Sequence, residues 1–141
     1  MKPPIVDVDV VVGLISDGAG RWLVNCRPDG RPMAGSWEFP GGKRQRDETP
    51  LTALKRELEE ELGIEVLEAQ PLLELEHDYP DKRVRLDVWQ VVRYRGRVTA
   101  REGQPLRWAT PEECRALPLL EADGPIVERL AALAGESPAR R

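Results

Sequence analysis

The 141-residue sequence has few of the features of a secreted or membrane protein. It has two cysteines, Cys26 and Cys114, which are far apart and form no C-x-x-C pair. This spacing excludes a disulfide framework and suits a reducing compartment. The longest apolar stretch, residues 8–15, contains Asp9 and is too short to cross a bilayer. The N-terminus also lacks the apolar run of a secretory signal, so we expect a cytoplasmic protein.

An excess of basic charge is also missing. The chain has 21 Lys and Arg against 25 Asp and Glu, a net charge of −4, so a broad binding surface for nucleic-acid polymers is not expected. Bound cations can invert a local field, so a small phosphate ligand stays compatible with this charge. The apolar share of 40% and the length fit one globular domain over residues 1–141. We expect a monomer with a frayed tail at residues 135–141.

Hydrophobic patterns predict an α+β protein. Strands are predicted at residues 6–12, 22–26, 37–39, 67–76, 84–94 and 106–109. A turn at residues 17–20 indicates that the first two strands form a hairpin. Helices are predicted at residues 50–62 and 123–134, with a helical turn at residues 111–116. Thr49 is a good N-cap, Pro50 suits the first helical position and Gly63 suits the end. Helices inserted among more numerous strands favour a mixed sheet.

The helix at residues 50–62 has an apolar and an acidic face. Its core-facing stripe consists of Leu51, Leu54, Leu58 and Leu62. Glu57, Glu60 and Glu61 follow spacings of three and four, so their carboxylates share another face. Carboxylate oxygens are natural ligands for Mg²⁺ or Mn²⁺. Taken alone, however, such a charged run is more typical of a solvated surface.

The spacing of the residues around these glutamates favours metal binding over a solvated surface. The pattern Gly42-x5-Glu48-x7-Arg56-Glu57-Leu58-x-Glu60-Glu61-x-Gly63-Ile64 resembles the Nudix box, with every defining position filled. The resemblance implies a Nudix-type α/β/α sandwich, with a mixed sheet packed between helices, and a hydrolase that splits a nucleoside diphosphate-type bond with Mg²⁺. It also implies metal binding by Glu57, Glu60, Glu61 and the Gly41 carbonyl, a glutamate oriented by Arg56, and a metal shell supported by Glu48.

Four further segments, residues 38–43, 79–82, 101–105 and 122–125, resemble the MutT branch of this family, the 8-oxo-dGTP diphosphatases. The resemblance implies hydrolysis of a nucleoside triphosphate to a monophosphate and pyrophosphate, which removes oxidised purine nucleotides such as 8-oxo-dGTP and so serves DNA repair. Glu102 would be an extra metal ligand or the base that deprotonates the attacking water. The nucleotide pocket would be lined by Arg27, Phe39, Asp81, Lys82 and Asp123.

Two positions depart from the branch. Asp123 stands where an asparagine is usual, and Lys82 where arginine is frequent. An ionised aspartate only accepts hydrogen bonds, so Asp123 would accept from purine N–H groups, be protonated, or simply cap the last helix. The other pocket residues also have structural alternatives: Phe39 as core, Arg27 in a salt bridge, and residues 81–82 as a turn.

Other functions therefore stay open. Within the family the substrate would be CTP or a modified pyrimidine triphosphate, ADP-ribose or another dinucleotide. Outside it, the chain would be a catalytically silent nucleotide-binding module or a metal-independent structural protein. The intact set of Glu57, Glu60 and Glu61 argues against both of these.

Overall fold

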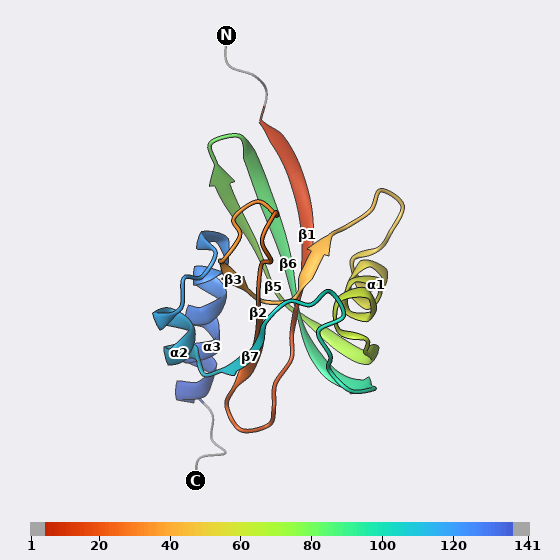
Figure 1. Ribbon diagram of the computed structural model, residues 1–141, viewed down its shortest axis with the longest axis vertical. Coiled ribbons are helices and arrows are strands. Elements are labelled where there is room, and N and C mark those ends of the chain that lie inside the picture. The colour runs from red at the N-terminus through yellow and green to blue at the C-terminus, as the bar shows by residue number, and fades with distance from the viewer. Residues whose placement is uncertain (1–4, 137–141) are drawn as a thin grey trace. The chain divides into compact units, whose positions relative to one another are not determined.

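The computed structural model describes residues 5–136, with side chains up to residue 133 (Figure 1). These residues form two compact units: unit 1 comprises residues 5–15 and 40–102, and unit 2 comprises residues 16–39 and 103–136. This division does not test the predicted single domain, which stays a prediction. No helix among the described residues is long and apolar enough to span a membrane.

Unit 1 consists of a four-stranded mixed sheet and one helix. Its elements are β1 (Val6–Leu14), β4 (Gly41–Lys43), α1 (Pro50–Leu62), β5 (Glu65–Tyr79) and β6 (Lys82–Arg95). The strand order is β4-β1-β6-β5, in which β1 and β6 run parallel and the other neighbours antiparallel. Strands β5 and β6 form a long hairpin (Figure 1). The predicted α+β class with a mixed sheet is confirmed.

Helix α1 begins and ends where the sequence predicts. The Thr49 hydroxyl accepts a hydrogen bond from the Thr52 amide at 3.2 Å, and Pro50 occupies the first turn. Gly63 has a left-handed φ of 71°, and its N–H donates to the Glu59 carbonyl. These local signals define the helix on their own. The stripe that attaches α1 to the sheet consists of the buried Ala53, Leu54, Leu58 and Leu62, with Leu51 half-buried.

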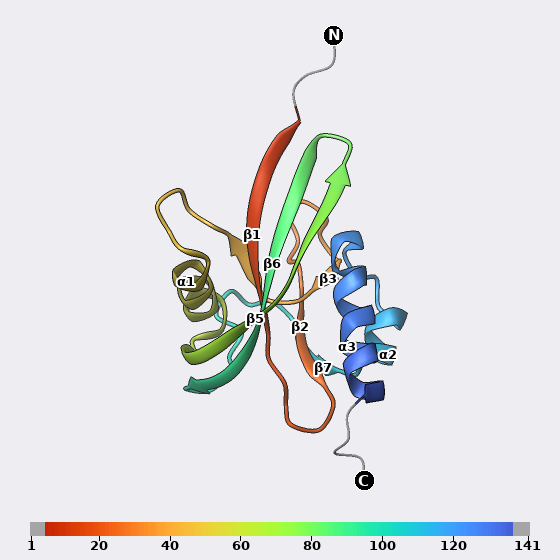
Figure 2. The same ribbon diagram turned by 180° about the vertical axis from the view of Figure 1, so that it is seen from behind.

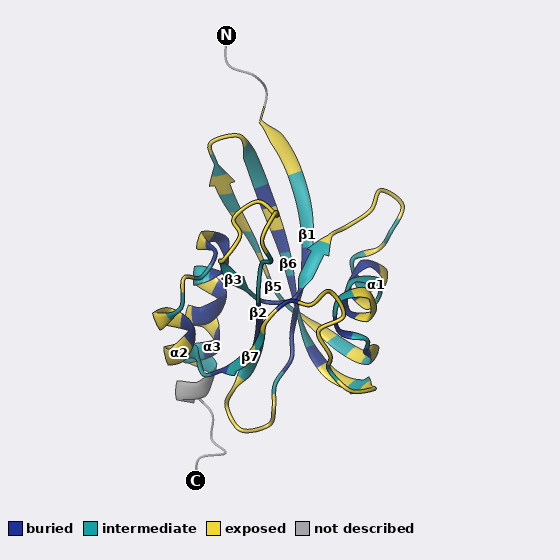
Figure 3. Ribbon diagram, in the orientation of Figure 1, coloured by how far each residue is buried: buried dark blue, intermediate teal, exposed yellow. Residues whose placement is uncertain are grey.

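Unit 2 consists of a three-stranded antiparallel sheet and two helices. Its elements are β2 (Trp22–Cys26), β3 (Trp37–Glu38), β7 (Leu106–Ala109), α2 (Pro111–Ala116), a 3₁₀ turn η1 (Glu121–Asp123) and α3 (Gly124–Glu136). The strand order is β3-β2-β7. Helices α2 and α3 lie side by side (Figure 2). The buried face of α3, dark blue in Figure 3, contains Ile126, Val127 and Leu130.

The predicted hairpin between the first two strands is wrong. Strand β1 pairs with β4 on one edge and with β6 on the other, so neither edge is left for β2. Strand β2 belongs to the other sheet, and one isolated bridge, Ser16 to Trp22, remains near the turn. The turn itself is stabilised by the Asp17 carboxylate, which accepts from the amides of Ala19 and Arg21.

Residues 41–43, shortly after the predicted strand at residues 37–39, form a further strand, β4, that the sequence did not predict. Gly41 pairs with Val12 and has a φ of 152°, a region that favours glycine. A Cβ on Gly41 would overlap the carbonyl oxygen of Val11. The chain therefore approaches β1 closely only because residue 41 is glycine.

The last helix differs slightly from the prediction. It begins at Gly124 rather than Asp123, which ends η1 instead. Of the predicted frayed tail, residues 135 and 136 belong to α3, and residues 137–141 lie outside the described residues.

Candidate functional site

Four predicted site residues come together in unit 1, and we call them the carboxylate cluster: Gly41, Glu57, Glu61 and Glu102. The Gly41 amide donates to Glu61 Oε1 at 3.4 Å, and the side chains of Glu57 and Glu61 hydrogen-bond to each other. Burial, followed by the negative charges of Glu57 and Glu102, raises the pKa of Glu61 far above its usual range. Burial and the neighbouring charges therefore favour the neutral form of Glu61 over a further negative charge in the cluster.

Gly42 provides the space that the Glu57 carboxylate occupies. A Cβ on Gly42 would overlap Glu57 Oε2 and would lie 2.7 Å from Glu57 Oε1. The conflict involves the end of a flexible side chain rather than backbone, so the fold could tolerate the methyl group. The carboxylate could not keep its position.

Gly42→Ala is therefore expected to fold with a nearly unchanged melting temperature while any activity that uses Glu57 falls about a hundredfold. Gly41→Ala is the contrasting variant, because its methyl group would meet the β1 backbone and should destabilise the whole protein. Thermal unfolding and kcat/KM measured side by side test both expectations. Full activity in Gly42→Ala would show that the Glu57 position does not matter.

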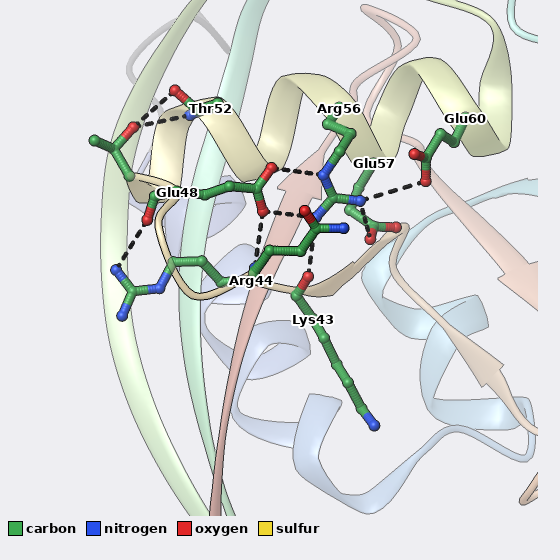
Figure 4. Close-up of polar contacts among 9 residues, drawn as sticks. Lys43, Arg44, Glu48, Thr52, Arg56, Glu57 and Glu60 are labelled. Atoms are coloured by element: carbon green, nitrogen blue, oxygen red, sulfur yellow. Dashed lines mark hydrogen bonds and ion pairs between the residues drawn. The ribbon is translucent and has the colours of Figure 1, made fainter.

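Arg56 links α1 to the loop before it (Figure 4). Its Nε and Nη2 donate to the two carboxylate oxygens of Glu48 at 2.6 and 2.8 Å, and Nη2 also donates to the Lys43 carbonyl at 3.1 Å. Its Nη1 donates to Glu57 Oε1 at 2.9 Å and to Glu60 Oε2 at 3.4 Å. The hydrogen bonds from Arg56 lower the pKa of Glu48 to about 2. Arg56 thus fixes both the loop and the Glu57 side chain.

Glu60 lies apart from the carboxylate cluster. Its side chain is 56% exposed and contacts Arg56 rather than Glu57 or Glu61. Within residues 5–136, no three acidic, histidine or cysteine side chains are grouped so that they could hold a metal ion as they stand. Metal binding by the three glutamates stays a prediction, and for Glu60 it requires a different side-chain rotamer.

A second group of polar residues lies in unit 2 around strand β3. Arg27 donates from Nε and Nη2 to the two oxygens of Glu38, at 3.0 and 3.2 Å, and from Nη1 to the Pro32 carbonyl at 3.1 Å. Phe39 is buried, and its amide donates to Asp123 Oδ2 at 3.0 Å. Glu38 was not predicted as a site residue, because nothing in the nearby sequence shows that it would pair with Arg27.

The Asp123 carboxylate continues a backbone ladder. The Trp37 amide donates to the Pro118 carbonyl at 2.9 Å, and the Leu120 amide donates to the Trp37 carbonyl at 2.8 Å. Two residues after Trp37, just past the end of β3, Asp123 accepts a hydrogen bond from the Phe39 amide. Asp123 therefore continues this ladder with its side chain. Burial raises its pKa to about 7, against the lowering effect of the Phe39 hydrogen bond.

Asp81 and Lys82 lie in unit 1, at the turn between β5 and β6. Asp81 is exposed, and Lys82 Nζ lies 5.4 Å from the centre of the Tyr79 ring. His77 contacts the same ring edge-on, with ring centres 4.7 Å apart. The predicted nucleotide residues are thus divided, with two in unit 1 and Arg27, Phe39 and Asp123 in unit 2.

A pocket of about 440 Å³ in unit 1 contains none of the predicted site residues. Its charged lining consists of Asp9, Arg44, Glu74, Glu76, Arg85 and Asp87. Arg44 is paired with Asp9 at 3.2 Å, and Arg85 lies 3.6 Å from Glu76. Because charged side chains in the lining pair with one another, we do not regard this pocket as the reaction site.

Comparisons with known proteins agree with this geometry. Residues 11–129 match the NUDIX domain. The chain is 39% identical over 129 residues to the CTP pyrophosphohydrolase of Escherichia coli (strain K12), covering 92% of this chain and 96% of that protein. It is 33% identical over 123 residues to the 8-oxo-dGTP diphosphatase of the same strain, covering 87% and 95%.

Solved structures show the same relationship. The solution structure of the E. coli ORF135 protein has a TM-score of 0.81 and 36% identity, covering 98% of this chain and 99% of that one. A MutT structure from a study of Aliivibrio salmonicida and Vibrio cholerae has a TM-score of 0.77 and 32% identity, covering 89% and 98%. From the matched domain, the relatives and the shared fold, we conclude that this chain belongs to the Nudix hydrolase family as a MutT-like member.

Proposed function

We propose that the protein hydrolyses a nucleoside triphosphate to a nucleoside monophosphate and pyrophosphate with Mg²⁺ or Mn²⁺. The carboxylate cluster carries this proposal, because Glu57 and Glu61 are held against each other beside the backbone of Gly41. Clustered carboxylate oxygens suit a hard divalent cation, whose charge would relieve their repulsion. Such a cation, when bound, polarises phosphoryl oxygens and lowers the pKa of a bound water.

The residues of the chain would have different roles in this reaction. Glu57, Glu60, Glu61 and the Gly41 carbonyl would hold the cation. Arg56 would keep Glu57 oriented through the hydrogen bond at 2.9 Å. Glu102, whose charge already acts on Glu61, would be a further ligand or would accept a proton from the attacking water.

The nucleotide would bind through Arg27, Phe39 and Asp123 of unit 2 and Asp81 and Lys82 of unit 1. With a pKa of about 7, Asp123 is partly protonated at neutral pH, so it could donate to a base as well as accept. We propose an oxidised purine triphosphate such as 8-oxo-dGTP as substrate, and a cytoplasmic role in cleansing the nucleotide pool for DNA repair.

CTP is the second candidate. The relative with 39% identity is named for CTP hydrolysis, and Asp123 replaces the asparagine that is usual in the MutT branch. The two candidates share the reaction and differ only in the base.

One panel tests the function and separates the candidates. With Mg²⁺ present, kcat/KM is measured for 8-oxo-dGTP, dGTP, CTP, 5-methyl-dCTP and ADP-ribose. We expect a triphosphate to be the best substrate and ADP-ribose to be cleaved poorly. A preference for ADP-ribose would refute the proposed substrate class, and binding without any cleavage would indicate a silent nucleotide-binding module.

A further inference from the structure

Asn25 is a buried polar residue in unit 2 that none of the proposed roles uses. It lies in strand β2 with 7% of its surface exposed, and its Oδ1 atom has no hydrogen-bond partner. Buried side-chain oxygens in native proteins are nearly always paired, because an unpaired one forfeits its hydration without compensation. An unpaired amide oxygen in this position therefore calls for a partner.

The position of Asn25 shows where that partner would lie. Asn25 is the cross-strand neighbour of Glu38, so both side chains stand on the same face of the sheet. Arg27 is two residues further along, and its guanidinium reaches the Glu38 carboxylate on that face. The next residue after Glu38 is Phe39, whose amide binds Asp123. Asn25 is thus adjacent to the residues of unit 2 that we expect to bind the nucleotide.

Glu38 does not satisfy the Asn25 side chain. Both Glu38 oxygens accept from Arg27, and a carboxylate has no hydrogen to donate to Oδ1 when it is ionised. Leu106, the neighbour of Asn25 on the β7 side, is apolar. Neither cross-strand neighbour of Asn25 therefore supplies a donor for Oδ1, and a ligand could supply one.

We propose that the Asn25 carboxamide contacts the base of the bound nucleotide and favours bases with an exocyclic amino group. This proposal rests on the proposed function, because it concerns the base of the same substrate. The amino groups of cytosine, adenine and guanine can donate to Oδ1, whereas uracil and hypoxanthine have no amino group. Asn25 would therefore determine specificity without taking part in the reaction.

Asn25→Leu tests the proposal, because leucine has nearly the same size and lacks the amide. We expect kcat/KM for CTP and dGTP to fall about tenfold, while UTP and dITP, which lack the amino group, change little. The melting temperature should stay the same or rise by roughly 4 °C, because a buried unpaired oxygen is removed. A structural amide satisfied by water would give the opposite pattern: a lower melting temperature with unchanged substrate ratios.

A second variant and a binding measurement complete the test. Asn25→Val suits a strand and gives a second apolar variant if the leucine does not fit. Binding of CMP and UMP to each variant, measured by calorimetry without turnover, shows the Asn25 effect even if the wild-type protein hydrolyses nothing. Failure of hydrolysis then counts against the proposed function, and equal losses for CMP and UMP binding count against the Asn25 contact.

Discussion

Glu61→Gln is expected to lower kcat/KM about a thousandfold, equivalent to ~4 kcal/mol of transition-state stabilisation. Glutamine keeps the oxygen that accepts from the Gly41 amide, and its NH₂ group can donate to Glu57 as a protonated Glu61 would. The variant thus retains the contacts of the metal-free cluster and loses only the ability to ionise and so to serve as an anionic ligand. Its melting temperature without metal should equal or exceed that of the wild type.

Glu59→Gln is the matched control for this variant. Glu59 lies on the same helix, two residues from Glu61, but its side chain is exposed to solvent. Activity and stability should therefore stay at the wild-type level. Near-normal turnover in Glu61→Gln, or equal losses in both variants, would show that the carboxylate cluster is not the reaction centre.

Asp123→Asn is expected to flatten the dependence of stability on pH. Burial raises the pKa of Asp123 to about 7 from the ordinary value of 3.8. The folded protein therefore binds a proton that the unfolded chain releases, and the stability this provides is complete below pH ~4. This contribution to stability, about 4 kcal/mol in total, is lost as the pH rises towards 7.

Asparagine cannot ionise, and its side-chain oxygen can still accept from the Phe39 amide. The free energy of unfolding of Asp123→Asn should consequently fall much less between pH 4.5 and 8 than that of the wild type. Urea unfolding at a series of pH values measures the free energy of unfolding of both proteins. The other titrating groups are the same in both, so their effects cancel when one curve is subtracted from the other. Parallel curves for the two proteins would mean that Asp123 is ionised in the folded state and that its burial has no such cost.

The Asp123→Asn variant also tests whether Asp123 contacts the base. If Asp123 contacts the base, affinity for 8-oxo-dGMP should change while turnover of unmodified triphosphates changes little. Unchanged affinity would leave Asp123 with the structural role of continuing the ladder beside β3.

Helix α1 could be predicted to the residue because its determinants are local. Thr49, Pro50 and Gly63 define its ends, and the leucine spacing defines its buried face. The spacing of Glu57 and Glu61, four residues apart, likewise places both carboxylates on one side of the helix without any knowledge of the sheet.

The errors concern contacts between distant segments. The hairpin of the first two strands looked plausible because they follow one another, yet β1 instead pairs with β6, more than seventy positions away. Asp123 carries the local signals of a helix cap, but its partner Phe39 is 84 residues distant. No pattern within one segment could show that Glu38 would pair with Arg27 or that Asn25 would be buried without a partner.

The carboxylate cluster is proposed to support metal-dependent hydrolysis of a nucleoside triphosphate to a monophosphate and pyrophosphate. Phosphorus NMR of the products from CTP and 8-oxo-dGTP, with Mg²⁺ and again with excess chelator, tests it most directly. We expect equal amounts of monophosphate and pyrophosphate with Mg²⁺, no reaction with chelator, and recovery when Mg²⁺ is restored. Formation of a diphosphate and orthophosphate, or hydrolysis that continues in the chelator, would contradict the account.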